Sequence, residues 1–126
     1  MEDQSDTASV LEELRMLEPI FHTQAFGTSM DDFARRMVDD YWEIGASGAR
    51  YDRAFILKHL EAAPPVDAKA AGWITSHHEV RRLSADTFLL TYKLQQLDRV
   101  TLRATLWRLS EEGWQIVFHQ GTIVSS

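Results

Sequence analysis

The C-terminal part of the chain holds two alternating segments that flank a short turn. Polar and apolar residues alternate through residues 103–109 and again through residues 114–122. A period of two is typical of β-strands that bury one face. The intervening residues 110–113 end in Gly113 and predict a hairpin turn. This hairpin constrains the fold more than any other feature, because it decides which side chains share a face of the sheet.

The pairing across the turn predicts two distinct faces. Counting back from the turn gives the opposed pairs Leu109 and Trp114, Trp107 and Ile116, Thr105 and Phe118, and Arg103 and Gln120. One face then carries aromatic and polar groups: Arg103, Thr105, Trp107, Trp114, Phe118 and Gln120. The other face carries Ala104, Leu106, Arg108, Gln115, Val117 and His119. The first face is typical of a small-molecule pocket. The alternative is that its aromatic residues are core, with Arg103 and Gln120 in solvent at the sheet edge.

The remaining segments predict helices first and strands afterwards. Helices are expected from residue 9 to a break at Pro19, over residues 30–38, and over residues 53–61 before two further prolines. Ser29 and Asp52 are the predicted N-caps of the second and third helices. Strands are expected over residues 41–44, 73–83, 87–97, 101–109 and 114–122, the last four as an antiparallel meander. This order predicts an α+β fold whose helices cover one face of a curved sheet.

Composition predicts one domain and excludes several classes of function. The 126 residues are 44% hydrophobic, enough for one core, and we expect a flexible leader over residues 1–8 and a domain over residues 9–124. Cysteine is absent, which excludes disulfides and thiolate chemistry. The net charge of −6, with scattered basic residues, indicates no nucleic-acid partner. No apolar run has membrane-spanning length, and no signal peptide is evident, so we expect no membrane contact and a cytoplasmic location.

Glu43 is an acidic residue within a short apolar strand. Alternation places it on the same face as Tyr41. A buried carboxylate needs a partner, and Arg103 is the predicted one. Glu43 would then orient a polar ligand, stabilise the fold, or act as a general acid or base if it is desolvated. The alternative is that Glu43 is exposed at the end of its strand.

The five histidines do not match a metal-binding motif. They are His22, His59, His77, His78 and His119. His77 and His78 point to opposite faces of one strand, so they do not chelate as helix neighbours would. We predict no metal and no cofactor, and we favour a hydrogen-bonded structural His119 over a composite site of His119, a second histidine and Glu43.

Several motifs together resemble the nuclear transport factor 2-like superfamily. The matching segments are residues 11–19, 40–48, 51–53, 90–92, 103–107 and 114–122. They are most similar to the bacterial branch of SnoaL-like proteins called domain of unknown function 4440. The resemblance implies a cone-shaped, strongly bent antiparallel sheet with three helices, a central pocket and a homodimer formed through the sheet. This fold hosts isomerases, dehydratases, hydrolases, cyclases and binding domains, so function has to come from the site.

We therefore predict a dimeric domain that binds a small hydrophobic or carbonyl-bearing ligand. The predicted ligand-binding residues are Tyr41, Glu43, Tyr92, Arg103, Thr105, Trp107, His119 and Gln120. Arg103 would bind a carboxylate or carbonyl, and tryptophans would form the apolar wall. One alternative is a cofactor-independent isomerase, cyclase or dehydratase acting on a carbonyl or polyketide-like compound, with Glu43 or His119 as the catalytic proton acceptor. The other is an assembly module without a ligand.

Overall fold

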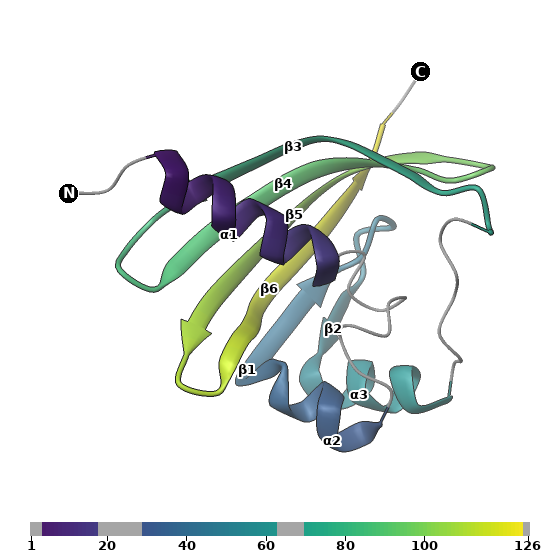
Figure 1. Cartoon of the computed structure of the whole chain (residues 1–126). Helices are drawn as coiled ribbons and strands as arrows, with labels where there is room; N and C mark the ends of the chain where they lie inside the picture. Colours follow the sequence, from purple (N-terminus) through teal and green to yellow (C-terminus); the bar gives the residue numbers. More distant parts are fainter. Residues whose placement is uncertain (1–3, 18–28, 63–69, 125–126) are drawn as a thin grey trace.

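A bent six-stranded sheet forms the body of the protein, with helices packed against one of its faces (Figure 1). The structure, a computed structural model, describes residues 4–17, 29–62 and 70–124. Its elements are α1 (Gln4–Leu17), α2 (Met30–Arg35), β1 (Met37–Ile44), β2 (Arg50–Asp52), α3 (Arg53–Ala62), β3 (Ile74–Arg82), β4 (Thr87–Gln95), β5 (Val100–Ser110) and β6 (Gly113–Ile123). The strand order across the sheet is β2-β1-β6-β5-β4-β3. The predicted α+β class with a bent sheet and three helices is confirmed.

The last four strands form the predicted antiparallel meander from β3 to β6. β1 extends the sheet on the other side of β6, and β2 pairs antiparallel with β1. The predicted sheet was antiparallel, but β1 and β6 pair in parallel. Near the end of β1, Glu43 lies opposite His119 of β6. The first half of the chain therefore supplies side chains that lie beside the C-terminal hairpin.

The second helix ends earlier, and the first strand begins earlier, than predicted. α2 ends at Arg35, and Met37 and Val38 belong to β1, not to the helix. Both side chains are buried in the core. The N–H of Ile116 in β6 donates to the carbonyl of Arg36 at 2.6 Å. Pairing with β6 thus satisfies backbone groups that a helix would otherwise have satisfied.

The predicted caps of the second and third helices are confirmed. Ser29 Oγ accepts a hydrogen bond from the N–H of Asp32 at 3.2 Å, and Asp52 Oδ1 accepts one from the N–H of Phe55 at 2.8 Å. The first helix begins at Gln4, so the start predicted at Ser9 lies inside it. Pro19 and the two prolines after the third helix lie outside the described residues.

A β-bulge in β6 shifts the pairing of the terminal hairpin. Near the turn the pairing is as predicted, with Trp107 opposite Ile116. Leu106 then lies opposite Phe118, because Val117 is an extra residue that has no counterpart in β5. The pairs predicted beyond this point, Thr105 with Phe118 and Arg103 with Gln120, are therefore wrong. The observed pairs are Thr105 with His119, Ala104 with Gln120, and Arg103 with Gly121.

The core lies on the helix-covered face of the sheet, which we call the inner face. Alternate residues of β4 and β5 face it, and Leu90 and Trp107 are fully buried there. Leu14 of α1 and Ile56 of α3 join the same cluster. The opposite face, which we call the outer face, carries the other alternate residues of these strands. None of the helices in the described part of the chain is both long and apolar enough to span a membrane.

Candidate functional site

A row of polar side chains crosses the inner face of the sheet. Glu43 of β1, His119 of β6 and Thr105 of β5 occupy neighbouring positions in three adjacent strands. All three are buried, with exposed fractions of 8%, 2% and 0%. Arg103 lies two residues from Thr105 on the same face of β5. Because buried polar groups need hydrogen-bond partners, these contacts determine what the row can do.

Hydrogen bonds link Thr105, His119 and Arg103, and also Thr101 of β5, in a fixed direction. Arg103 Nη1 lies 3.1 Å from His119 Nε2, and His119 Nδ1 lies 2.7 Å from Thr105 Oγ1. A guanidinium group only donates, so Nε2 of His119 is the acceptor. The imidazole therefore carries its proton on Nδ1 and donates it to Thr105. At the other end of the chain of bonds, Arg103 Nε donates to Thr101 Oγ1 at 3.0 Å.

His119 is held in its neutral form. Burial, and to a smaller extent the positive charge of Arg103, lowers the pKa of His119 from 6.5 to about 3. Its only ring lone pair already accepts from Arg103. His119 is consequently a structural acceptor that orients Arg103, as the hydrogen-bonded interpretation predicted. The geometry does not suit it to the role of catalytic proton acceptor.

Arg103 is a partly buried cation that is held by neutral groups. Its guanidinium lies over Gly121, where an added Cβ would sit 3.5 Å from Cζ. That distance is an ordinary van der Waals contact, so the guanidinium packs directly over the backbone of residue 121 on the inner face. Within the ranges that the structure describes, Arg103 forms no ion pair with a carboxylate. Its charge is therefore not cancelled by a neighbouring acid there.

The predicted ion pair between Glu43 and Arg103 does not form. Glu43 Oε1 instead accepts a hydrogen bond from the hydroxyl of Tyr41 at 2.7 Å, two residues along the same strand. The physical reason is the parallel β1–β6 register, which places Glu43 beside His119. The expectation that Glu43 and Tyr41 share one buried face is correct.

Tyr92 lies next to Arg103 on the inner face. It pairs with Arg103 in the β4–β5 register and is 3% exposed. On its other side its ring stacks on His78 of β3, with centroids 5.4 Å apart. A bulge at His77, whose φ is +58°, places His78 opposite Tyr92. Tyr92 therefore borders Arg103, as the predicted site requires.

Two of the predicted site residues are placed elsewhere. Trp107 is fully buried and belongs to the core, so the core interpretation of this tryptophan is correct. Gln120 lies on the outer face, because the bulge at Val117 reverses the alternation of β6. The same shift brings His119 to the inner face, although unbroken alternation assigned it to the other one. Phe118 also moves outward, and its ring packs against Trp42 at 4.9 Å.

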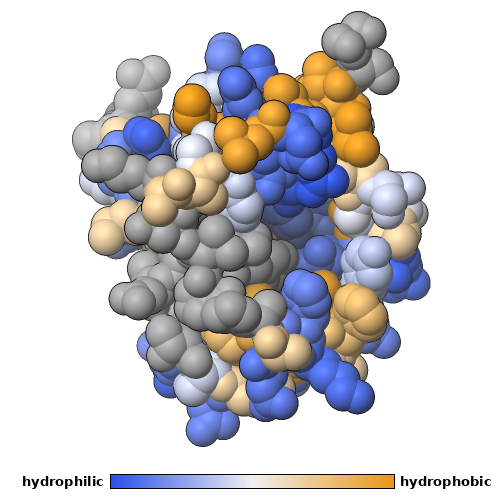
Figure 2. All heavy atoms as spheres, turned by 90° about the vertical axis from the view of Figure 1, so that its right-hand side faces the viewer, coloured by the Kyte–Doolittle hydropathy of each residue, from blue (hydrophilic) through white to orange (hydrophobic). Residues whose placement is uncertain are grey.

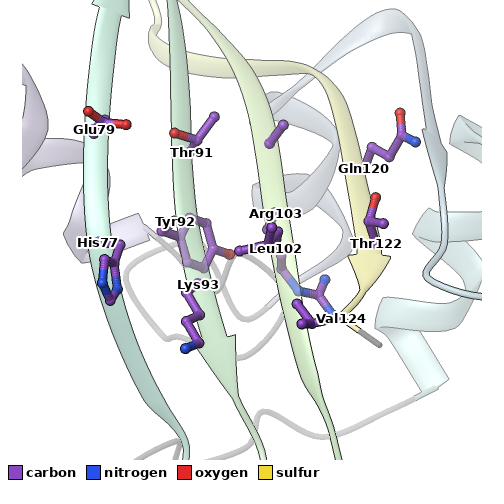
Figure 3. Close-up of a pocket in the computed structure, with 11 residues that line it drawn as sticks. His77, Glu79, Thr91, Tyr92, Lys93, Leu102, Arg103, Gln120, Thr122 and Val124 are labelled. Atoms are coloured by element: carbon purple, nitrogen blue, oxygen red, sulfur yellow. The ribbon is translucent and has the colours of Figure 1, made fainter. Parts of the chain in front are cut away.

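Among the hollows in the described part of the chain, two lie on opposite faces of the sheet. The larger of these two, of about 600 Å³, lies over β3 to β6 on the outer face, where Glu79, Thr91, Lys93 and Gln120 surround it, and Tyr92 and Arg103 are also among the residues that line it (Figure 3). The smaller one, of about 270 Å³, lies between α3 and β1 on the inner face, and Glu43 lines it. In the described segments, no three His, Asp or Glu side chains are grouped so as to hold a metal ion.

Comparisons with known proteins identify the fold. No family model matches the chain, and no curated protein matches its sequence. An NTF2-like protein from Cytophaga hutchinsonii superposes with a TM-score of 0.64 at 14% identity, over 98% of this chain and 100% of its own. A DUF3225-family protein of unknown function from Pectobacterium atrosepticum gives 0.67 at 18%, over 94% and 90%. A domain of unknown function with a cystatin-like fold from Nostoc punctiforme gives 0.62 at 18%, over 99% and 81%. The chain therefore has the nuclear transport factor 2-like, or cystatin-like, fold.

Sequence reasoning missed several residues around the polar row. Thr101 accepts a hydrogen bond from Arg103, and Gly121 lies beneath the guanidinium. Thr101 is two residues from Arg103, and Gly121 is two residues from His119. Phe55 of α3 is 52% exposed and lines the smaller hollow with His59. Their spacing of four residues was the available signal, since side chains at i and i+4 share one helix face.

The neutral state of His119 predicts a specific loss of stability in acid. Its pKa is lower in the folded protein than in the unfolded chain, so the unfolded chain binds more protons between pH 6.5 and pH 3. Stability is therefore lost as the pH falls through this window, by about 2 kcal/mol between pH 7.5 and pH 5. His119→Gln removes this titration and should flatten the pH dependence of the free energy of unfolding, measured with urea, by that amount.

Comparing the two proteins isolates His119, because both retain His78. The pKa of His78 is also lowered, by burial and then by Arg15. An identical pH dependence in wild type and His119→Gln would show that His119 is not held neutral.

Proposed function

We propose that the inner face of the sheet binds a small organic molecule through a carboxylate or another anionic oxygen at Arg103. The observation that carries the proposal is a partly buried guanidinium held by neutral partners. Charge-assisted hydrogen bonds from arginine to carboxylates are among the strongest that proteins form. Arg103 is therefore suited to anchor the polar end of a ligand.

The hydrogen bonds of Arg103 support this assignment because they fix its position and leave donors for a ligand. A guanidinium has five N–H groups, and two of them donate to Thr101 and His119. Three remain, and neither partner offsets the positive charge. Fixing a side chain before binding lowers the entropy lost on association. Tyr92 borders Arg103 in the neighbouring strand and supplies an apolar neighbour for the guanidinium.

We also propose which branch of this fold the protein belongs to. The motif at residues 40–48 supports the SnoaL-like branch that contains domain of unknown function 4440. Likeness of fold at 14–18% identity does not distinguish between branches. A binding role is favoured over catalysis because the lone pair of His119 is occupied by Arg103.

Replacing Arg103 should weaken the binding of carboxylates. Arg103→Met keeps much of the aliphatic chain and removes the charge, so we expect the affinity for small carboxylates, benzoate among them, to fall by about tenfold or more. Benzamide, the neutral analogue of benzoate, should bind more weakly to wild type. Ligand-observed NMR across a panel of small carboxylates measures both effects.

Arg108→Met is the matched control, because Arg108 is an exposed arginine of the same strand. It should leave carboxylate binding unchanged. Equal binding by wild type and Arg103→Met, or equal binding of benzoate and benzamide, would contradict the proposal.

We also propose that the outer face forms a homodimer. The helices contact the sheet from the inner face, so the residues over β4 and β5 on the outer face are uncovered. Leu102 and Ile74 are more than half exposed, and apolar side chains gather at the end of the sheet where β6 ends (Figure 2). Glu79 and Lys93 lie on the same face. A two-fold interface would bring such opposite charges of two subunits together.

A charge placed in this face should dissociate the dimer. We expect sedimentation equilibrium at micromolar concentration to give a dimer for wild type and a monomer for Leu102→Glu, because burying an unpaired charge opposes association. Leu97→Glu is the control, since Leu97 is 89% exposed in the β4–β5 turn and lies away from the face. A monomeric wild type would refute the proposed interface.

A further inference from the structure

The smaller hollow combines a carboxylate with a wall of aromatic rings. It lies between α3 and the strands β1 and β2, and its volume is about 270 Å³. Glu43, Tyr51, Phe55, Ile56 and His59 line it. Arg103 is not among these residues. The hollow is therefore a separate feature from the oxyanion site at Arg103.

Three rings form a stacked series along one side of the hollow. Tyr51 and Phe55 have centroids 4.8 Å apart and an interplanar angle of 22°. Phe55 and His59 follow, with centroids 6.5 Å apart and an angle of 5°. Strand pairing and helix periodicity position these three rings. Tyr51 lies opposite Glu43 in the β1–β2 pair, and Phe55 and His59 lie one helical turn apart on α3.

The exposure of Phe55 is notable for an aromatic residue in this position. The neighbouring Ile56 is 5% exposed and belongs to the core, whereas Phe55 is 52% exposed. About half of the Phe55 side chain thus remains accessible beside the hollow, where a ligand can contact the part of the ring that Tyr51 and His59 leave uncovered. Aromatic faces carry negative electrostatic potential and attract cations within about 6 Å of the ring centre.

Glu43 adds a negative charge at the wall of the same hollow. Its carboxylate is held by the hydroxyl of Tyr41 at 2.7 Å, and the residue is 8% exposed. A carboxylate attracts a cation, and a cation bound beside it favours its charged form. The net charge of −6 adds a favourable long-range field for a positive ligand.

We propose that this hollow binds a small organic ammonium ion, with Glu43 as its counter-ion and the rings of Tyr51 and Phe55 as its aromatic wall. Aromatic rings attract alkylated ammonium groups, and the carboxylate supplies the opposite charge. A metal ion is disfavoured because hard cations need several oxygen ligands, and within the described ranges no cluster of three acids or histidines exists. This cation site goes beyond the oxyanion site, because the two take opposite charges and use different residues.

The choline cation is the probe for this site, and 3,3-dimethyl-1-butanol is its uncharged isostere. By NMR titration of wild type, we expect choline to bind at least about tenfold more tightly than the neutral alcohol. Glu43→Gln should weaken choline binding by about tenfold, because it removes the counter-ion while keeping the shape. Phe55→Leu should weaken it by about fivefold through loss of the ring face.

The controls separate this proposal from the oxyanion site and from general charge effects. Glu61→Gln removes an exposed carboxylate of the same helix, and Arg103→Met removes the oxyanion site; both should bind choline as wild type does. Phe55 is exposed, so Phe55→Leu should fold even if Glu43→Gln does not. Equal affinity for choline and its neutral isostere, or wild-type affinity in Phe55→Leu, would overturn the proposal. If the choline results overturn the cation site, loss of carboxylate binding in Arg103→Met alone would still support the oxyanion site.

Discussion

The hydrogen bond from Arg103 to His119 is the interaction on which the candidate site depends. A guanidinium donates and cannot accept, so this single contact at 3.1 Å fixes the tautomer of the imidazole and the direction of the bond to Thr105. Burial then keeps the imidazole neutral. A protonated His119 would place a second positive charge beside Arg103 and would remove its acceptor. Neutrality of the histidine is thus the condition for a positioned and available arginine.

The β-bulge at Val117 makes this contact possible. Without an extra residue, the alternation of β6 would point Gln120 toward Arg103 and His119 to the outer face. The bulge reverses this order, so that His119 lies opposite Thr105. A bulge depends on how two strands pair, and alternation within one strand does not reveal it. Unbroken alternation therefore predicted that Gln120 shares the face of Arg103, whereas its neighbour His119 occupies that face.

Local sequence patterns predicted the helices and strands of the fold. Contacts between distant segments could not be predicted from them. Ser29 and Asp52 act as caps through bonds that span three residues, and such short-range chemistry is visible in the sequence. The partner of Glu43 depends on the parallel register of β1 with β6, about 75 residues away along the chain. This register places Glu43 beside His119 and not beside Arg103. The hydroxyl of Tyr41 donates a hydrogen bond to Glu43 instead. The hollow lined by Phe55 was not predicted, because residues of β1, β2 and α3 form it and only the tertiary structure brings them together.

Nitrogen-15 NMR of the His119 ring measures its tautomer and protonation directly. We predict a proton on Nδ1 and an unprotonated, hydrogen-bonded Nε2. Because the pKa of His119 is about 3, the chemical shifts of both nitrogens should stay the same between pH 7 and pH 4.5. In Arg103→Met the Nε2 resonance should move, since its donor is lost. A proton on Nε2 at pH 7, or protonation of the ring near pH 6.5, would contradict the account, because His119 would then not accept from Arg103.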